Sequence, residues 1–150
     1  MDIKAQLEQD LKNAMRSGNV IEKNTIRMAL TNLKMAEVER GGQIDSATQL
    51  ALIQKEIKMR QETLEVSEKE GREDLAAKAR EEMAVLSRYL PRQLSEDELK
   101  AVVAQAIEEV GAAGPADIGK VMKAAMGKVQ GQAPGDAVSR IARELLQNRK

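Results

Sequence analysis

Hydrophobic residues recur every three or four positions along most of the chain, which predicts helices rather than strands. Ile3, Leu7 and Leu11 begin this pattern. No stretch alternates hydrophobic and polar residues over the length of a strand. We therefore predict an all-α protein. The first four helices are expected over residues 2–16, 20–40, 47–70 and 73–90, and three more are expected to begin near Ser95, at Gly114-Pro115 and after Gly131–Asp136.

Pro91 marks the clearest internal boundary, because it lacks a backbone donor and disfavours helix at the preceding residue. We predict an N-terminal helical subdomain of about four helices over residues 1–90. A small C-terminal three-helix subdomain is predicted over residues 91–150. Ser95 with Glu98, and Ser46 with Gln49, have the spacing of capping boxes, so a helix should begin at each.

The same periodicity predicts which side chains face inward. Leu75 in the fourth helix and Leu145 in the seventh are expected in the core, whereas Met28 and Met35 lie off the apolar stripe of their helix. The middle of the third helix is heavily charged and is interpreted as a mixed, solvated surface. Its charged residues are Lys55, Glu56, Lys58, Arg60 and Glu62.

Composition limits the kinds of catalytic and metal-binding sites that this 150-residue chain can form. It has no cysteine and no histidine, and Tyr89 is its only aromatic residue. Thiol nucleophiles, disulfides, most zinc sites and the usual acid–base catalyst at neutral pH are thereby excluded. We predict no catalytic residue, metal or cofactor. The polar N-terminus has no apolar signal core and no run of 18 apolar residues occurs, so no membrane association and a cytoplasmic location are predicted.

Positive charge collects near the C-terminus of a chain whose formal net charge is zero. Residues 118–150 contain seven basic and two acidic residues, a local charge of +5. Helical projection puts Lys120, Lys123 and Lys128 within an arc of about 140° around Gly127. Arg140 and Arg143 face away from the apolar residues of the next helix. These faces predict a surface that contacts phosphates, although such a patch also occurs simply as a solvated face.

Several segments resemble the GatB/YqeY family over essentially the whole chain, and its stand-alone YqeY branch in particular. The resemblance lies in Asp117–Met122 (DIGKVM), in Gly131, Ala133, Gly135 and Val138, in TIRMALTNLKMAEVE (Thr25–Glu39) and in YLPRQLSEDEL (Tyr89–Leu99). The glycine-rich turn departs from the common Gly-Lys-Ala-Asp-Gly pattern. Gln132 replaces its lysine and Pro134 its aspartate, which lowers the positive charge.

The resemblance implies a tRNA-contacting C-terminal module like the tail of the GatB subunit in the tRNA-dependent amidotransferases. We therefore predict a non-catalytic helical adaptor that binds tRNA or a tRNA-charging or amidotransferase complex. Two alternatives stay open: a protein–protein interaction module without RNA binding, and an accessory part of a glutamine-dependent carbon–nitrogen ligase. The predicted nucleic-acid-binding residues are Lys120, Lys123, Gly127, Lys128, Gly131, Gly135, Arg140 and Arg143.

Overall fold

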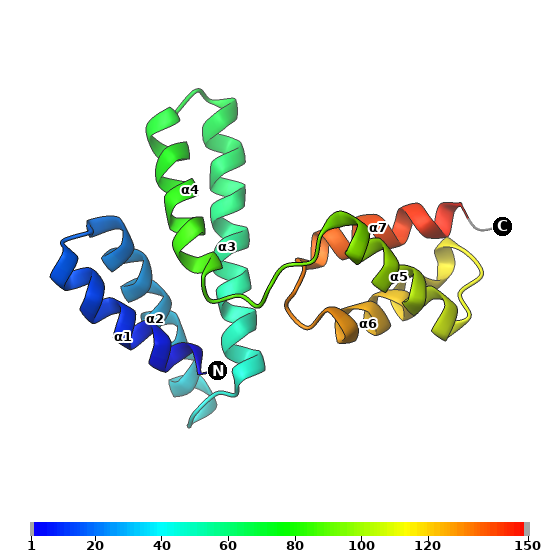
Figure 1. Cartoon of the computed structure of the whole chain (residues 1–150), viewed down its shortest axis with the longest axis horizontal. Coiled ribbons are helices and arrows are strands. Elements are labelled where there is room, and N and C mark those ends of the chain that lie inside the picture. Colours follow the sequence, from blue (N-terminus) through cyan, green and yellow to red (C-terminus); the bar gives the residue numbers. More distant parts are fainter. Residues whose placement is uncertain (1, 149–150) are drawn as a thin grey trace. The chain divides into compact units, whose positions relative to one another are not determined.

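The computed structural model describes residues 2–148, and this part of the chain is helical without any strand. The all-α prediction is therefore confirmed. The chain divides into two compact units, of which one ends at Leu90 and the other begins at Pro91 (Figure 1). Each unit has a hydrophobic core of its own.

The N-terminal unit consists of two helical hairpins. The first hairpin pairs α1 (Ile3–Ser17) with α2 (Val20–Arg40), and the second pairs α3 (Ser46–Lys69) with α4 (Glu73–Ser87) (Figure 1). Gly18 at φ +75° and Gly41 at φ +79° end α1 and α2 in the left-handed conformation that glycine adopts without strain. The residues that are fully buried between the hairpins include Leu7, Ile26, Leu33, Ile53 and Leu86.

The start of α3 differs from the predicted capping box. Asp45 is the capping residue, and its carboxylate accepts a hydrogen bond from the Thr48 amide at 2.8 Å. Gln49 is buried and accepts a hydrogen bond from the Lys4 amide at 3.2 Å. The Ser46–Gln49 prediction was wrong because Asp45 caps equally well, and a buried glutamine connects α3 to α1.

The fourth helix is shorter than predicted. It ends at Ser87 rather than Leu90, and Arg88–Leu90 form a turn before Pro91. In that turn Tyr89 is buried and its hydroxyl donates to Asp10 Oδ2 at 2.5 Å. Burial, with the adjacent carboxylate of Asp10, raises the pKa of the Tyr89 hydroxyl. Leu75, predicted to be in the core, is 41% exposed, and Ala76 is buried in its place.

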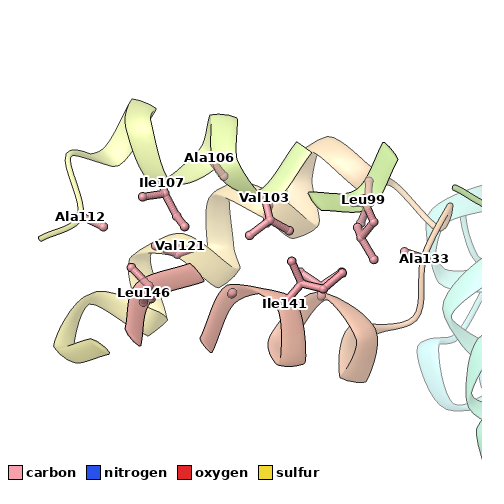
Figure 2. Packing of buried hydrophobic residues seen from close by; sticks show 13 residues of the cluster. Leu99, Val103, Ala106, Ile107, Ala112, Val121, Ala133, Ile141 and Leu146 are labelled. Atoms are coloured by element: carbon pink, nitrogen blue, oxygen red, sulfur yellow. The ribbon is translucent and has the colours of Figure 1, made fainter. Parts of the chain in front are cut away.

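The C-terminal unit packs three helices around one core (Figure 2). These are α5 (Glu96–Val110), α6 (Ile118–Val129) and α7 (Gly135–Gln147), with a 3₁₀ turn η1 (Pro115–Asp117) before α6. Leu146, rather than the predicted Leu145, is fully buried. The other core residues of the cluster are Leu99, Val103, Ala106, Ile107, Ala112, Val121, Ala125, Val129, Ala133, Val138, Ile141 and Ala142.

The capping box predicted at the start of α5 is confirmed. The Ser95 hydroxyl accepts from the Glu98 amide, and Glu98 Oε1 accepts from the Ser95 amide, each at 3.1 Å. Arg92 Nη2 also donates to Glu98 Oε2 at 2.9 Å. The hydrogen bond from Arg92, followed by those from Ser95, lowers the pKa of the Glu98 carboxyl to about 2.

Candidate nucleic-acid interface

The solvent-facing side of α6 carries two of the predicted basic residues. Gly119, Lys120, Lys123, Met126 and Gly127 are all exposed, and at 100° per residue they fall within an arc of about 120°. We call this surface the α6 outer face. A Cβ atom added at Gly119 or Gly127 would meet nothing within 4 Å. Neither lysine forms an ion pair with a residue that the structure describes. The face thus combines two available cations with a bare helix backbone.

Two other predicted cations are already paired with carboxylates. Lys128 Nζ lies 2.7 Å from Glu109 Oε1 on α5. Arg140 Nη2 lies 2.9 Å from Glu96 Oε1, also on α5, and Arg140 Nη1 lies 3.6 Å from Glu144. The hydrogen bond with Glu96 raises the pKa of Arg140. Both cations would have to exchange these partners before they could bind a phosphate.

The position of Lys128 explains its pairing. In helical projection it lies only about 20° from Val121, at the edge of the apolar stripe rather than opposite it. Its side chain is therefore half-buried against α5, whereas Lys120 and Lys123 are exposed. Of the three lysines of α6, Lys120 and Lys123 are therefore exposed, whereas Lys128 connects α6 to α5.

Arg143 is exposed on α7 and has no ion pair with a described residue. It lines a small hollow of about 230 Å³ together with Pro115, Ile118, Leu146 and Gln147. Arg143 is thus the third available cation among the predicted residues. It borders the start of α6, where the 3₁₀ turn leads into the helix.

The glycine-rich turn between α6 and α7 is held by its own unit. Gln130 at φ +41° and Gly131 at φ +83° are consecutive left-handed residues. The Gly131 carbonyl accepts from Gln93 Nε2 at 3.0 Å, and the Gln132 carbonyl accepts from the Leu94 amide at 2.8 Å. The positive φ angle of Gly131 is sufficient to explain why this position holds a glycine. A Cβ at Gly135 would only touch Met126 Cε at 4.0 Å.

The acidic helix α5 offsets much of the local charge. Residues 118–150 have a charge of +5, but residues 91–150 contain nine basic and eight acidic residues, which leaves +1. Two of the basic residues, Arg149 and Lys150, lie outside the described residues. The charge that remains for a partner therefore resides in individual unpaired cations rather than in a uniform basic surface.

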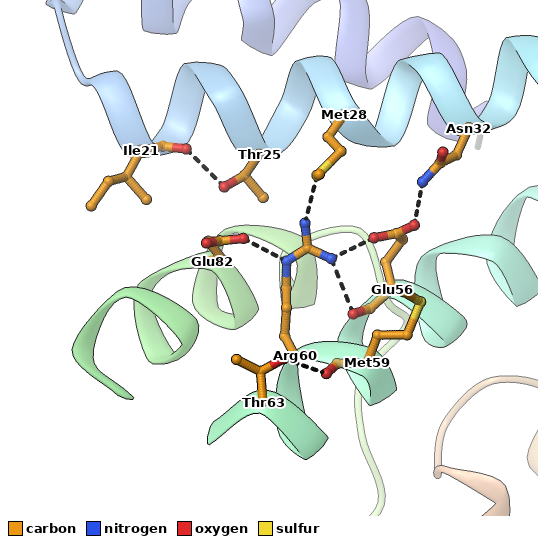
Figure 3. A network of polar contacts seen from close by, with 9 residues as sticks. All are labelled: Ile21, Thr25, Met28, Asn32, Glu56, Met59, Arg60, Thr63 and Glu82. Atoms are coloured by element: carbon orange, nitrogen blue, oxygen red, sulfur yellow. Dashed lines mark hydrogen bonds and ion pairs between the residues drawn. The ribbon is translucent and has the colours of Figure 1, made fainter. Parts of the chain in front are cut away.

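A buried charge in the N-terminal unit was missed by the sequence analysis (Figure 3). Arg60, interpreted as part of a solvated surface, is 8% exposed. Its Nε donates to Glu82 Oε2 at 2.7 Å, and its Nη1 donates to the Glu56 carboxylate and to the Glu56 carbonyl at 3.2 Å. Asn32 also donates to Glu56. The sequence did hold a signal, because in helical projection Arg60 lies only about 20° from Ile53, at the edge of the stripe formed by Ile53, Ile57 and Leu64.

One known protein family matches this chain. The profile of a family described as Yqey-like protein matches residues 4–146, which is nearly the whole chain. The chain belongs to the YqeY-like protein family. The resemblance to the stand-alone YqeY branch is thereby confirmed.

Curated relatives of this YqeY-like chain come from fungi. Three of them are named Altered inheritance of mitochondria protein 41, mitochondrial. The relative from Lachancea thermotolerans is 31% identical over 77% of this chain and 64% of its own length. Those from Vanderwaltozyma polyspora and Clavispora lusitaniae are 33% and 29% identical over 56% and 72% of this chain, and over 46% and 64% of their own. The chain therefore spans less than two thirds of these relatives.

These names contradict the cytoplasmic location predicted from the sequence. All three relatives are named as mitochondrial proteins, which overturns the predicted cytoplasmic location. The prediction was wrong because it rested on the lack of an apolar signal core and of a long apolar run. Neither observation bears on mitochondrial import, since transit peptides are amphipathic and rich in arginine.

Among residues 2–148, no helix combines the length and the apolar character that crossing a membrane requires. Over the same residues, no three carboxylates gather closely enough to hold a metal ion.

Proposed function

We propose that this protein is a non-catalytic helical adaptor whose C-terminal unit binds tRNA, alone or within a tRNA-charging complex. The observation that carries the proposal is the α6 outer face. There Lys120 and Lys123 are exposed and unpaired with any described residue, beside a helix backbone left bare at Gly127. Phosphate contacts by lysine and arginine supply most of the affinity in sequence-independent binding to nucleic acid.

Gly127 supports the proposed contact with tRNA, because the fold itself does not require a glycine at this position. Glycine in a helix costs about 0.5–1 kcal/mol relative to alanine. Gly127 has no positive φ angle and no neighbour that would meet a Cβ atom. A phosphate backbone that approaches the helix closely would account for a residue that no contact within the chain explains. Lys128 and Arg140 contribute only where RNA displaces Glu109 and Glu96.

The triple variant Lys120→Ala/Lys123→Ala/Arg143→Ala should bind tRNA more weakly and with less dependence on salt. Three lost phosphate contacts should lower the slope of log affinity against log salt concentration by about 2–3. The measurement is fluorescence anisotropy of labelled tRNA with the full chain across a salt series.

A matched control removes the same charge from the N-terminal unit. Lys34→Ala/Lys55→Ala/Lys58→Ala also changes three exposed lysines but leaves the α6 outer face intact. It should keep the parent slope. The proposed surface is wrong if the first triple variant keeps that slope, or if both triple variants lower it equally.

Gly127→Ala should stabilise the C-terminal unit and weaken tRNA binding at the same time. The added methyl group favours the helix by about 0.5–1 kcal/mol but stands between the backbone and a phosphate. Urea unfolding and tRNA titration of one preparation measure both effects. Gly42→Ala is the control, since that glycine is equally open but lies in the N-terminal unit. Unchanged tRNA affinity in Gly127→Ala would exclude close approach at this helix.

A second candidate function is a protein–protein interaction module. It is favoured by the exposed methionines Met28 and Met59, which lie in the N-terminal unit and not on the α6 outer face. The accessory role in a carbon–nitrogen ligase rests on the family resemblance. Amide transfer from glutamine by the purified chain, with no other subunit present, would replace the adaptor proposal with an enzymatic one.

A further inference from the structure

Four exposed apolar side chains of the N-terminal unit gather around one groove. Val20, Met28, Met59 and Leu75 are each at least 41% exposed, and they come from three different helices. They line two hollows of about 460 and 490 Å³. Both hollows also include Lys78 and Glu82, so they form one continuous groove between α2 and the α3–α4 hairpin. Exposed apolar side chains that cluster in this way mark interaction sites.

Arg60 lies in this groove with one edge incompletely bonded (Figure 3). Its Nε and Nη1 donate to the two glutamates, whereas Nη2 donates to the thioether sulfur of Met28 at 3.1 Å. Among the described residues this sulfur is the only acceptor for Nη2, which carries two hydrogens, and a thioether is a weak acceptor. A carbonyl or carboxylate oxygen of a partner would be a better one.

The remaining charges of the groove select for acidic partners. Both lining carboxylates, Glu56 and Glu82, are paired with Arg60, and the three groups together carry a net charge of −1. The two other charged lining residues, Arg27 and Lys78, are exposed and have no ion pair with a described residue. The groove therefore offers exposed apolar side chains with two unpaired cations beside them. This complementarity fits an apolar stripe flanked by carboxylates.

We propose that the groove binds an acidic amphipathic helix of a partner protein. Along α2 the lining runs from Val20 to Asn32, a length of about 18 Å at 1.5 Å per residue. A helix of three to four turns fits that length, and apolar anchors at positions i, i+3, i+4 and i+7 are the common way to fill such a groove. Methionine adapts its shape to different apolar anchors, which suits Met28 and Met59 to this role. The proposal is independent of tRNA binding by the other unit.

The probe is a synthetic fluorescein-labelled helix of about 14 residues, with leucine at i, i+3, i+4 and i+7 and glutamate beside the leucines. Its two controls carry lysine in place of glutamate, or the same residues in scrambled order. With the full chain, the glutamate peptide should bind at least about tenfold more tightly than either control. Arg27→Glu/Lys78→Glu should reverse the preference and favour the lysine peptide.

Apolar contact is tested with matched methionines. Met59→Ser should weaken binding of the glutamate peptide, while Met35→Ser should not, because Met35 is equally exposed but does not line the groove. The proposal is overturned if the scrambled peptide binds as well as the ordered one, or if the charge reversal leaves the preference unchanged. It is also overturned if sedimentation shows a dimer that Met59→Ser dissociates, because the groove would then hold a second copy of this chain.

Discussion

Arg60→Met should lower the free energy of unfolding of the N-terminal unit by about 3–5 kcal/mol, since removing one partner of a buried ion pair leaves the other charges uncompensated. The loss is expected here because Glu56 and Glu82 both depend on this guanidinium and are themselves largely buried. Burial acts to lower the pKa of Arg60, but the hydrogen bonds with Glu56 and Glu82 outweigh it and raise the pKa.

Urea unfolding followed by Tyr89 fluorescence measures this effect. Tyr89 is the only aromatic residue of the chain and is buried in the N-terminal core, so its signal reports on that unit. The matched control is Arg80→Met, because Arg80 pairs with Glu68 and Glu73 on the surface. An exposed pair contributes about 0–1 kcal/mol, so this variant should change little.

A compensated variant separates lost charge pairing from lost packing. Arg60→Met/Glu56→Gln/Glu82→Gln removes all three charges together and should recover most of the stability lost in Arg60→Met. Equal losses in Arg60→Met and Arg80→Met would contradict the account, as would a compensated variant no more stable than Arg60→Met alone.

The helices themselves followed from periodicity and caps, but the partners of side chains on different helices did not. Gly18 and Gly41 are local signals that end helices close to the predicted boundaries, and the Ser95–Glu98 box starts a helix as predicted. Asp45 and Ser46 offered the same cap one residue apart, and only the contact of Gln49 with Lys4 decides between them. Leu75 shows that helical periodicity can also mislead. Its spacing along the fourth helix predicted burial, but α2 does not cover that position.

In the candidate interface, too, the sequence predicted which side chains are exposed but not which side chains of other helices they contact. Helical projection was sufficient to place Lys120 and Lys123 on an exposed face. It could not show that Glu109 and Glu96, on a helix earlier in the sequence, would pair with Lys128 and Arg140. Charge counted over a segment therefore overstated what a nucleic acid would meet, because packing of α5 brings carboxylates to the cations.

Ile141→Ala should lower the stability of the C-terminal unit by about 2–5 kcal/mol, from lost burial and the cavity left behind. Ile141 is fully buried among residues of all three helices (Figure 2). A core in a unit of this size supplies a net stability of only about 3–5 kcal/mol, so the variant should be largely unfolded there at about 37 °C. Ile141→Val, which removes a single methylene group, should cost only about 0.5–1.5 kcal/mol.

Two probes make this variant a test of the proposed domain boundary at Pro91. Circular dichroism follows the helices of both units, whereas Tyr89 fluorescence follows the N-terminal unit alone. If the units fold as separate domains, Ile141→Ala should lose part of its helical signal early in a urea titration, while the Tyr89 midpoint stays at the parent value. Binding of tRNA should then fall along with the early transition. A Tyr89 midpoint that shifts together with the helical signal would instead show one cooperative domain, in which the two cores stabilise each other.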